Sequence, residues 1–227
     1  MGKKSNIKSD IFDNIDTEEK AYWLGFIYAD GNISDMESYL RKSGKYVYRM
    51  EISLKADDID HLNKLKRFLG YEKEIKISKV GDRSERCRLY FNDKHMWHTL
   101  NNIGCTPVKS LTLKFPELSV FKDKELIRHF IRGYVDGDGC ISYCDKEHKA
   151  MTLRILGTKH FLENMQNNMP LEKNNKIPKK ENIYELTFQR ARGIYVCNFL
   201  YKNCTVYLER KLNRYKEYCR LYKESYR

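Results

Sequence analysis

Two short segments, about half the chain length apart, are near copies of each other. WLGFIYADGNIS spans Trp23–Ser34 and FIRGYVDGDGCIS spans Phe130–Ser142, and both are apolar runs that end in Asp-Gly and continue as x-Ile-Ser. The similarity extends beyond the motif, because the same order of strand-like and helix-like patterns follows each copy. A repeat of this length predicts two related structural units within one chain.

Hydrophobic periodicity predicts the same elements in each half. The motif is predicted to be a helix, and each half then reads helix, strand pair, helix, strand pair, helix, which is an α+β unit. The expected strands are Lys45–Lys55, Glu74–Val80, Arg86–Phe91, His148–Leu156, Asn174–Pro178 and Ile183–Gln189, and the further helices are Ile59–Gly70, Lys94–Cys105, Lys159–Met169 and Gly193–Cys204.

We divide the chain into a first half at 1–112, a connecting segment at 113–125 and a second half at 126–227. The connecting segment contains Pro116 but is not rich in Gly or Ser. We therefore expect two packed halves, not two domains on a flexible linker.

The ends of the motif helices have local signals. Asp16 to Glu19 has the spacing of a capping box at a helix start, and Lys122–Glu125 is the corresponding start in the second half. Gly31 and Gly139 follow the last helical residues, where a glycine commonly takes the left-handed conformation.

Small residues recur four positions apart inside both motif helices. They are Gly25 and Ala29 in the first copy and Gly133 and Gly137 in the second. Glycine inside a helix costs about 1 kcal/mol relative to alanine, whereas a stripe of small residues lets two backbones approach closely. We expect the two motif helices to pack against each other about a pseudo-twofold axis.

This packing would place Asp30 and Asp138 side by side at two helix C-termini. Two carboxylates at the negative ends of helices repel each other unless a cation is present. Carboxylate and carbonyl oxygens are ligands that suit a hard divalent ion such as Mg²⁺. The seven cysteines contain no C-x-x-C pair, which argues against zinc and for reduced thiols in a reducing compartment.

The two repeated segments resemble the two motifs of a LAGLIDADG homing endonuclease in its single-chain, two-repeat form. The matching stretches are WLGFIYADG and IRGYVDGDG. The resemblance covers nearly the whole chain. It implies two pseudo-symmetric αββαββα halves with antiparallel, saddle-shaped sheets that lie along the DNA major groove. It also implies that Asp30 and Asp138 are the catalytic, metal-binding residues, assisted by the carbonyl groups of Ala29 and Gly137.

The family also places a lysine near each scissile phosphate. Lys109 matches this position in the first half, and in the second half Lys211 competes with Arg210. The sixth motif position is usually acidic in the family and is Tyr28 in the first copy here and Asp136 in the second. The resemblance implies Mg²⁺-dependent cleavage of both strands of a long, asymmetric DNA target by a monomer, with Mn²⁺ or Ca²⁺ as substitutes for binding.

Alternation along the expected strands puts polar side chains on one face of each sheet. Arg and Gln on such a face can make bidentate contacts to guanine and adenine edges. The candidate DNA-binding residues are Lys45, Arg49, Ser53, Lys55, Arg86 and Arg88 in the first half and Arg154, Thr187, Gln189 and Arg190 in the second.

The net charge of +12 also indicates a polyanionic partner. The sequence shows no membrane-spanning run and no secretory signal, so an intracellular location is expected, in the cytoplasm of a bacterium or phage-infected cell or in an organelle matrix. Three alternatives stay open: a maturase that assists splicing of its intron RNA, a non-catalytic DNA-binding regulator, and an intein. The intact pair of acids favours cleavage over the first two, and the missing splice-junction residues argue against the third.

Overall fold

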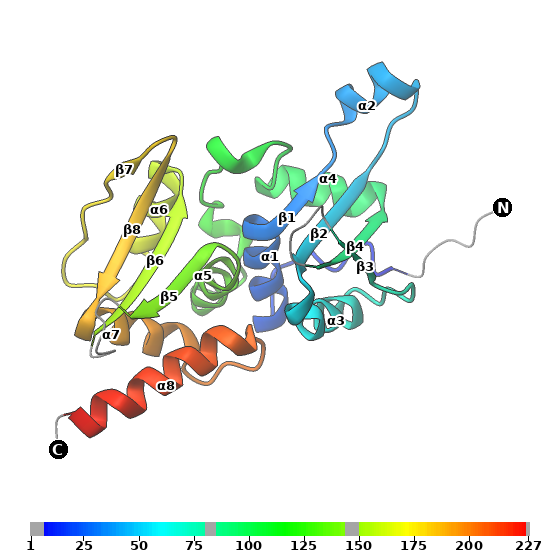
Figure 1. Cartoon of the computed structure of the whole chain (residues 1–227). Coiled ribbons are helices and arrows are strands. Elements are labelled where there is room, and N and C mark those ends of the chain that lie inside the picture. The colour runs from blue at the N-terminus through cyan, green and yellow to red at the C-terminus, as the bar shows by residue number, and fades with distance from the viewer. Residues whose placement is uncertain (1–6, 80–84, 144–149, 226–227) are drawn as a thin grey trace.

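The computed structural model describes residues 7–79, 85–143 and 150–225, and it contains the two expected halves side by side (Figure 1). The first half consists of α1 (Glu18–Asp30), β1 (Gly31–Ile33), α2 (Met36–Ser43), β2 (Arg49–Lys55), α3 (Ile59–Phe68), β3 (Lys76–Ser78), β4 (Arg86–Asn92) and α4 (Lys94–Ile103). The second consists of α5 (Glu125–Asp138), β5 (Gly139–Tyr143), β6 (Met151–Gly157), α6 (Lys159–Asn167), β7 (Lys179–Lys180), β8 (Ile183–Gln189), α7 (Arg190–Tyr201) and α8 (Glu209–Ser225).

Each half has one four-stranded antiparallel sheet with the same strand order. The orders are β1-β2-β4-β3 and β5-β6-β8-β7, and α3 and α4 in the first half correspond to α6 and α7 in the second. The predicted αββαββα arrangement is therefore confirmed in both halves. The sequence patterns assigned no residues to α2 and α8 or to the first strand of each sheet, β1 and β5. The domain boundaries stay a prediction, although the two sheets lie on either side of the proposed connecting segment.

Several strand boundaries differ from those expected. The strand expected from Lys45 begins only at Arg49, and Val80, His148 and Lys149 lie outside the described residues. No strand forms at Asn174–Pro178, because Asn175 bonds Gln166 through its main chain at 3.0 Å and the Thr187 carbonyl oxygen through its side chain at 2.5 Å. The Gln166 side chain thus holds both main-chain groups of Asn175, and the segment bonds the main chain of β8 at its end, where the Pro178 carbonyl oxygen accepts from the Glu185 N–H at 3.1 Å.

Helices α1 and α5 lie together in the centre of the molecule, between the two sheets (Figure 1). A methyl group at Gly25 would overlap the carbonyl oxygen of Phe130, and one at Gly133 would overlap that of Tyr22. The two backbones are thus in direct contact. Around this contact the buried apolar side chains of both halves form one continuous core.

The expected caps of the motif helices were wrong in detail. The residue that caps α1 is Thr17, whose side chain accepts a hydrogen bond from the Lys20 main chain at 3.3 Å, while Asp16 forms an ion pair with Lys20 at 2.9 Å. Gly31 and Gly139 are extended, with φ of −76° and −86°, because each helix leads directly into a strand. Glycine is needed there for space, since a Cβ would crowd the carbonyl oxygen of Ile27 or Val135.

Within the described ranges, no helix is both long enough and apolar enough to cross a membrane.

Candidate active site

The two motif aspartates are the last residues of α1 and α5. Asp30 is half-buried, and a Cβ added to Gly137 would lie only 3.3 Å from Asp30 Oδ2, so the two motif ends are in contact. Burial and the charge of Asp138 raise the pKa of Asp30 to about 6, although Lys211, Lys109 and Arg86 oppose the shift. Partial desolvation also raises the pKa of the more exposed Asp138, against the effects of Lys109, a hydrogen bond with Tyr134, and Lys211.

A lysine from each half lies against the C-terminal end of the motif helix in the same half. Lys109, in the short 3₁₀ turn Lys109–Leu111, donates from Nζ to the carbonyl oxygen of Ala29 at 3.3 Å and to that of Gly31. Lys211, in the first turn of α8, donates to the carbonyl oxygens of residues 135, 136 and 137 at 2.7, 2.6 and 3.1 Å. Each ammonium group therefore contacts the partly negative end of a helix.

The structure distinguishes between the two basic residues that competed in the second half. The Arg210 Nε donates to both carboxylate oxygens of Asp58, at 2.9 and 3.0 Å, and so is held by the first half. Lys211 is only 4% exposed and contacts the motif directly. Its burial lowers its pKa to about 8, although nearby carboxylates, with Asp136 foremost, oppose the shift. We therefore assign Lys211, not Arg210, to the candidate site.

The donor groups at this site fit a hard divalent cation. The described residues contain no group of three or more His, Cys, Asp or Glu side chains placed to hold a metal ion, so the available side-chain ligands at this site are the two carboxylates. Burial and the charge of Asp138 both raise the pKa of Asp30, and a bound cation would offset both effects. The carbonyl oxygens of Ala29 and Gly137 each accept one hydrogen bond from a lysine, and a carbonyl oxygen has a second lone pair.

The exposed face of the first sheet collects most of the predicted DNA-binding residues of that half. Met50, Ile52 and Leu54 of β2 are buried, so the alternate residues of this strand face outward. Strand pairing places Lys55 opposite Arg86 and Ser53 opposite Arg88. The outward face carries Arg49, Ser53, Lys55, Arg86 and Arg88, whereas Lys45 lies outside the sheet in the bend after α2.

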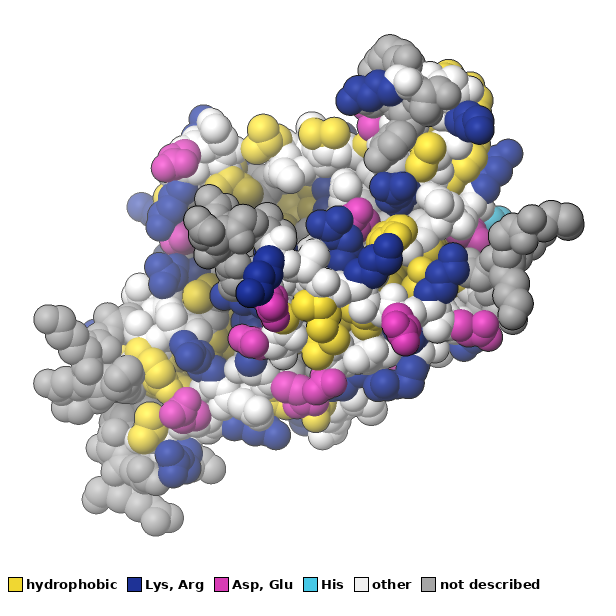
Figure 2. Space-filling view, turned by 45° about the vertical axis from the view of Figure 1, so that its right-hand side comes forward, with side chains coloured by type: hydrophobic (Ala, Val, Ile, Leu, Met, Phe, Trp, Pro, Cys, Tyr) yellow, Lys and Arg dark blue, Asp and Glu magenta, His cyan; other side chains and the backbone are white. Residues whose placement is uncertain are grey.

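Contacts on this face hold the side chains in fixed positions. Arg88 forms an ion pair with Glu51 at 3.1 Å, and Arg86 donates to the Ser53 hydroxyl at 3.0 Å. Tyr90 interacts with the cations of Arg49 and Lys76, which lie 5.7 and 5.3 Å from its ring centroid. Figure 2 shows several Lys and Arg side chains side by side across the middle of one face.

Sequence reasoning did not select Lys76 or Tyr90 as binding residues. The alternation that selected Arg86 and Arg88 continues to Tyr90, and Lys76 pairs with Arg88 across the sheet. The alternating pattern therefore indicated that Tyr90 lies on the outward face. The pattern was weak for Lys76, because β3 has only three residues.

The corresponding face of the second sheet is less basic. Arg154 of β6 pairs with Thr187 of β8, and Gln189 of β8 pairs with Thr152. The Arg154 guanidinium donates to the Ser142 hydroxyl at 3.2 Å. Arg190 is exposed at the start of α7, just beyond this sheet.

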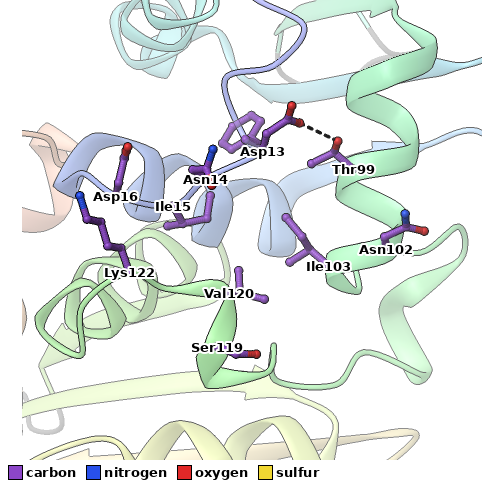
Figure 3. A pocket seen from close by; sticks show the side chains of 11 residues that line it. Asp13, Asn14, Ile15, Asp16, Thr99, Asn102, Ile103, Ser119, Val120 and Lys122 are labelled. Atoms are coloured by element: carbon purple, nitrogen blue, oxygen red, sulfur yellow. Dashed lines mark hydrogen bonds between the residues drawn. The ribbon is translucent and has the colours of Figure 1, made fainter.

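An open pocket elsewhere contains none of the predicted site residues. It lies between the segment before α1, helix α4 and the connecting segment (Figure 3), where the Thr99 hydroxyl donates to Asp13 at 3.0 Å. Asp16 in its lining precedes α1, whereas Asp30 ends that helix, which at 1.5 Å per residue is about 20 Å long. The pocket is therefore separate from the aspartate pair.

Comparison with known proteins supports the fold. No family model and no curated protein matches the chain. The LAGLIDADG homing endonuclease I-LtrWI bound to target DNA matches with a TM-score of 0.61 at 12% identity over 91% of both chains. A mesophilic variant of the homing endonuclease I-DmoI matches at 0.51 and 24% identity, over 85% of this chain and 96% of that chain.

A third similar structure is I-SmaMI bound to an uncleaved DNA target in the presence of calcium ions. It matches with a TM-score of 0.53 at 13% identity, over 90% of this chain and 92% of that chain. The chain therefore has the fold of the LAGLIDADG homing endonucleases, with both halves in one polypeptide.

Proposed function

We propose that this chain is a site-specific DNA endonuclease that makes a divalent-metal-dependent double-strand break at a long, asymmetric target, in the homing of an intron or other mobile element. One observation carries the proposal. Asp30 and Asp138 meet at the ends of two packed helices, and each helix end has a lysine from its own half against it.

The residues of this chain suit phosphodiester hydrolysis. Asp30 and Asp138, with the carbonyl oxygens of Ala29 and Gly137, would hold the divalent ion, for which we propose Mg²⁺. When bound, such an ion polarises water and neutralises charge on the attacking and leaving oxygens. Lys109 and Lys211 place positive charge beside the two carboxylates, where they would stabilise the charge that develops on the phosphate.

The two sheets would recognise DNA along its major groove. Arg49 and Arg88 have the donor geometry for guanine and Gln189 for adenine, while Lys55 and Arg190 suit phosphate contacts. The first sheet carries more basic residues than the second, so the two halves of the target would differ in sequence. Because one chain supplies both halves, we propose that it acts as a monomer.

The maturase and regulator alternatives are less well supported. Both acids and both lysines are present and in contact with the two motif ends, which a purely binding role does not require. I-LtrWI and I-SmaMI were each solved with DNA, and neither structure gives support for an RNA ligand.

The proposal is tested by cleavage of a plasmid library in Mg²⁺, comparing the wild type with Asp30→Asn and Asp138→Asn. The library includes the sequence formed by joining the DNA that flanks the gene's host intron, if one exists. Discrete double-strand breaks with short 3′ overhangs, lost or reduced to nicks in the variants, would support the nuclease. Tight, salt-sensitive binding of DNA or RNA without any cleavage would instead support a regulator or a maturase.

A further inference from the structure

The sixth residue of each motif is deeply buried and lies two positions before the aspartate. Tyr28 occupies this position in α1 and is 1% exposed, and Asp136 occupies it in α5 and is fully buried. The two side chains differ in size and charge, so they cannot make the same packing contacts. Their polar atoms nevertheless reach corresponding parts of the two halves.

In the first half, Tyr28 contacts the end of α4. Its hydroxyl donates to the carbonyl oxygen of Ile103, the last residue of that helix, at 2.8 Å. The same hydroxyl leaves no room for a side chain at Gly104, where a Cβ would lie 2.8 Å away. From this point the chain runs through a short segment to Lys109.

In the second half, Asp136 contacts the end of α7 and the start of α8. One carboxylate oxygen accepts from the Tyr201 hydroxyl at 2.6 Å, and the other accepts from the Leu208 main-chain N–H at 2.8 Å and from the Tyr22 hydroxyl at 2.8 Å. Leu208 immediately precedes α8, and its carbonyl oxygen accepts from the main-chain N–H of Lys211 at 3.0 Å. Asp136 thus holds the turn from which Lys211 projects.

We infer that Tyr28 and Asp136 are positioning residues, each of which fixes the lysine of its own half against its own motif helix. The inference rests on the proposed function. In both halves, a buried polar group of the motif helix bonds the main chain upstream of the lysine, six residues before Lys109 and three before Lys211, while the lysine bonds main-chain carbonyls at the end of that same helix. Two contacts thus hold each lysine: the hydrogen bond of Tyr28 or Asp136 to the main chain, and the bonds of the lysine to the helix end. Loss of the first contact would let the lysine move away from the helix end.

The test is strand-resolved cleavage of a DNA target labelled differently on each strand. Lys109→Met and Lys211→Met first establish which strand each half cuts. Tyr28→Phe is then expected to slow cleavage of the DNA strand that depends on Lys109, and Asp136→Asn to slow cleavage of the strand that depends on Lys211. Each rate should fall by roughly tenfold or more relative to the rate for the other strand, because small displacements of groups in an active site are costly.

Tyr22→Phe is the matched control, because it also removes a buried hydrogen bond to Asp136 but does not release α8. We expect it to leave the ratio of the two strand rates at the wild-type value. Tyr201→Phe is the second variant if Asp136→Asn does not fold. It removes the hydrogen bond that holds the other carboxylate oxygen of Asp136, so the carboxylate can turn away from Leu208, and we expect the ratio to shift in the same direction by a smaller factor. Equal slowing of both strands by these variants would overturn the inference, since a general loss of stability has that effect.

A second measurement does not depend on cleavage. Lysine acetylation, followed by peptide mass spectrometry on the folded, metal-free protein, reports how well each ammonium group is held. Tyr201→Phe, which keeps the charge of Asp136, should raise the acetylation rate of Lys211 but not of Lys109, and Tyr28→Phe should do the reverse. Unchanged rates would refute the positioning role even if no DNA substrate is cut, whereas wild-type failure to cut any target refutes only the nuclease.

Discussion

At the scale of single residues, the motif aspartates lie where a negative charge is unfavourable. They end two helices whose C-termini carry partial negative charge, and Asp30 is desolvated beside Asp138, which raises its pKa to about 6. A carboxyl group whose pKa is higher in the folded state stabilises the protein most at low pH. That contribution is lost as pH rises from about 4 through about 6.

Asp30→Asn is therefore expected to stabilise the metal-free protein while it removes double-strand cleavage. At pH 7.5 with EDTA, the free energy of unfolding should rise by about 2 kcal/mol, which is the pKa shift converted to energy and reduced for solvent screening. At pH 4 most of the difference from the wild type should disappear, because Asp30 is then neutral in the folded protein and only partly ionised in the unfolded chain. Urea denaturation at the two pH values measures both effects.

Glu172→Gln is the control, because Glu172 is an exposed carboxylate in a loop. It should change the free energy of unfolding little at either pH. An Asp30→Asn variant that is less stable than the wild type at pH 7.5 would show that Asp30 is stabilised by its neighbours without a metal ion.

At the scale of elements, the contact between α1 and α5 determines where the site forms. Gly25 and Gly133 each lie against a carbonyl oxygen of the opposite helix, and Gly137 lies against the Ala29 side chain. These glycines bring the two helix ends close enough for the carboxylates to interact. The glycines that follow the helices serve a different purpose, since they open space for the turn into β1 and β5.

Gly133→Ala is expected to separate the two helices. The added methyl group would overlap the Tyr22 main chain, which cannot rotate away as a side chain can, so the free energy of unfolding should fall by about 3 kcal/mol or more. Gly44→Ala is the comparison, because no atom lies within 4 Å of a Cβ there and only its φ of +66° opposes alanine. It should cost about 1 kcal/mol. Similar losses in the two variants, measured by thermal or urea unfolding, would contradict close packing at Gly133.

At the scale of the whole molecule, the two halves are joined by more than the motif helices. Helix α8 of the second half forms ion pairs with the first half, from Glu209 to Lys64 at 2.7 Å and from Arg210 to Asp58 at 2.9 Å. The buried Arg132 also forms an ion pair with the partly exposed Glu18, at 2.7 Å, which links α5 to the start of α1. With these contacts, the outward faces of the two sheets are held at a fixed spacing, which the proposed recognition of one long target requires.

Binding of the DNA target is expected to depend steeply on salt, because the chain has a net charge of +12. Affinity should fall by about a thousandfold or more between 50 and 200 mM salt. Lys55→Gln, on the outward face of β2, should lower the slope of log K against log salt by about one. Fluorescence anisotropy in Ca²⁺ measures these slopes.

The matched control is Lys124→Gln, which removes the same charge. Lys124 is exposed at the start of α5, about 20 Å along the helix from Asp138. For Lys124→Gln, the slope of log K against log salt should equal that of the wild type. Equal reductions in both variants would mean that net charge, and not the sheet face, determines binding.

Local sequence patterns determined most of the elements, though not α2 or α8, and the equivalence of the two halves. Alternating apolar residues such as Met50, Ile52 and Leu54 predict a strand with one buried face wherever they occur. Two motif copies with matching spacing predict that Asp30 and Asp138 occupy equivalent positions. These features depend on neighbours along the chain, which is why they could be inferred before the structure was known.

Only the tertiary structure decided which side chains meet. Arg210 and Lys211 are adjacent in sequence, yet Arg210 contacts Asp58 of the first half and Lys211 contacts the end of α5. The part played by Asp136 was also hidden, since its three hydrogen-bond partners come from α1, α7 and the turn before α8. Periodicity shows which face of an element is buried, whereas a hydrogen bond between distant residues depends on how the elements pack.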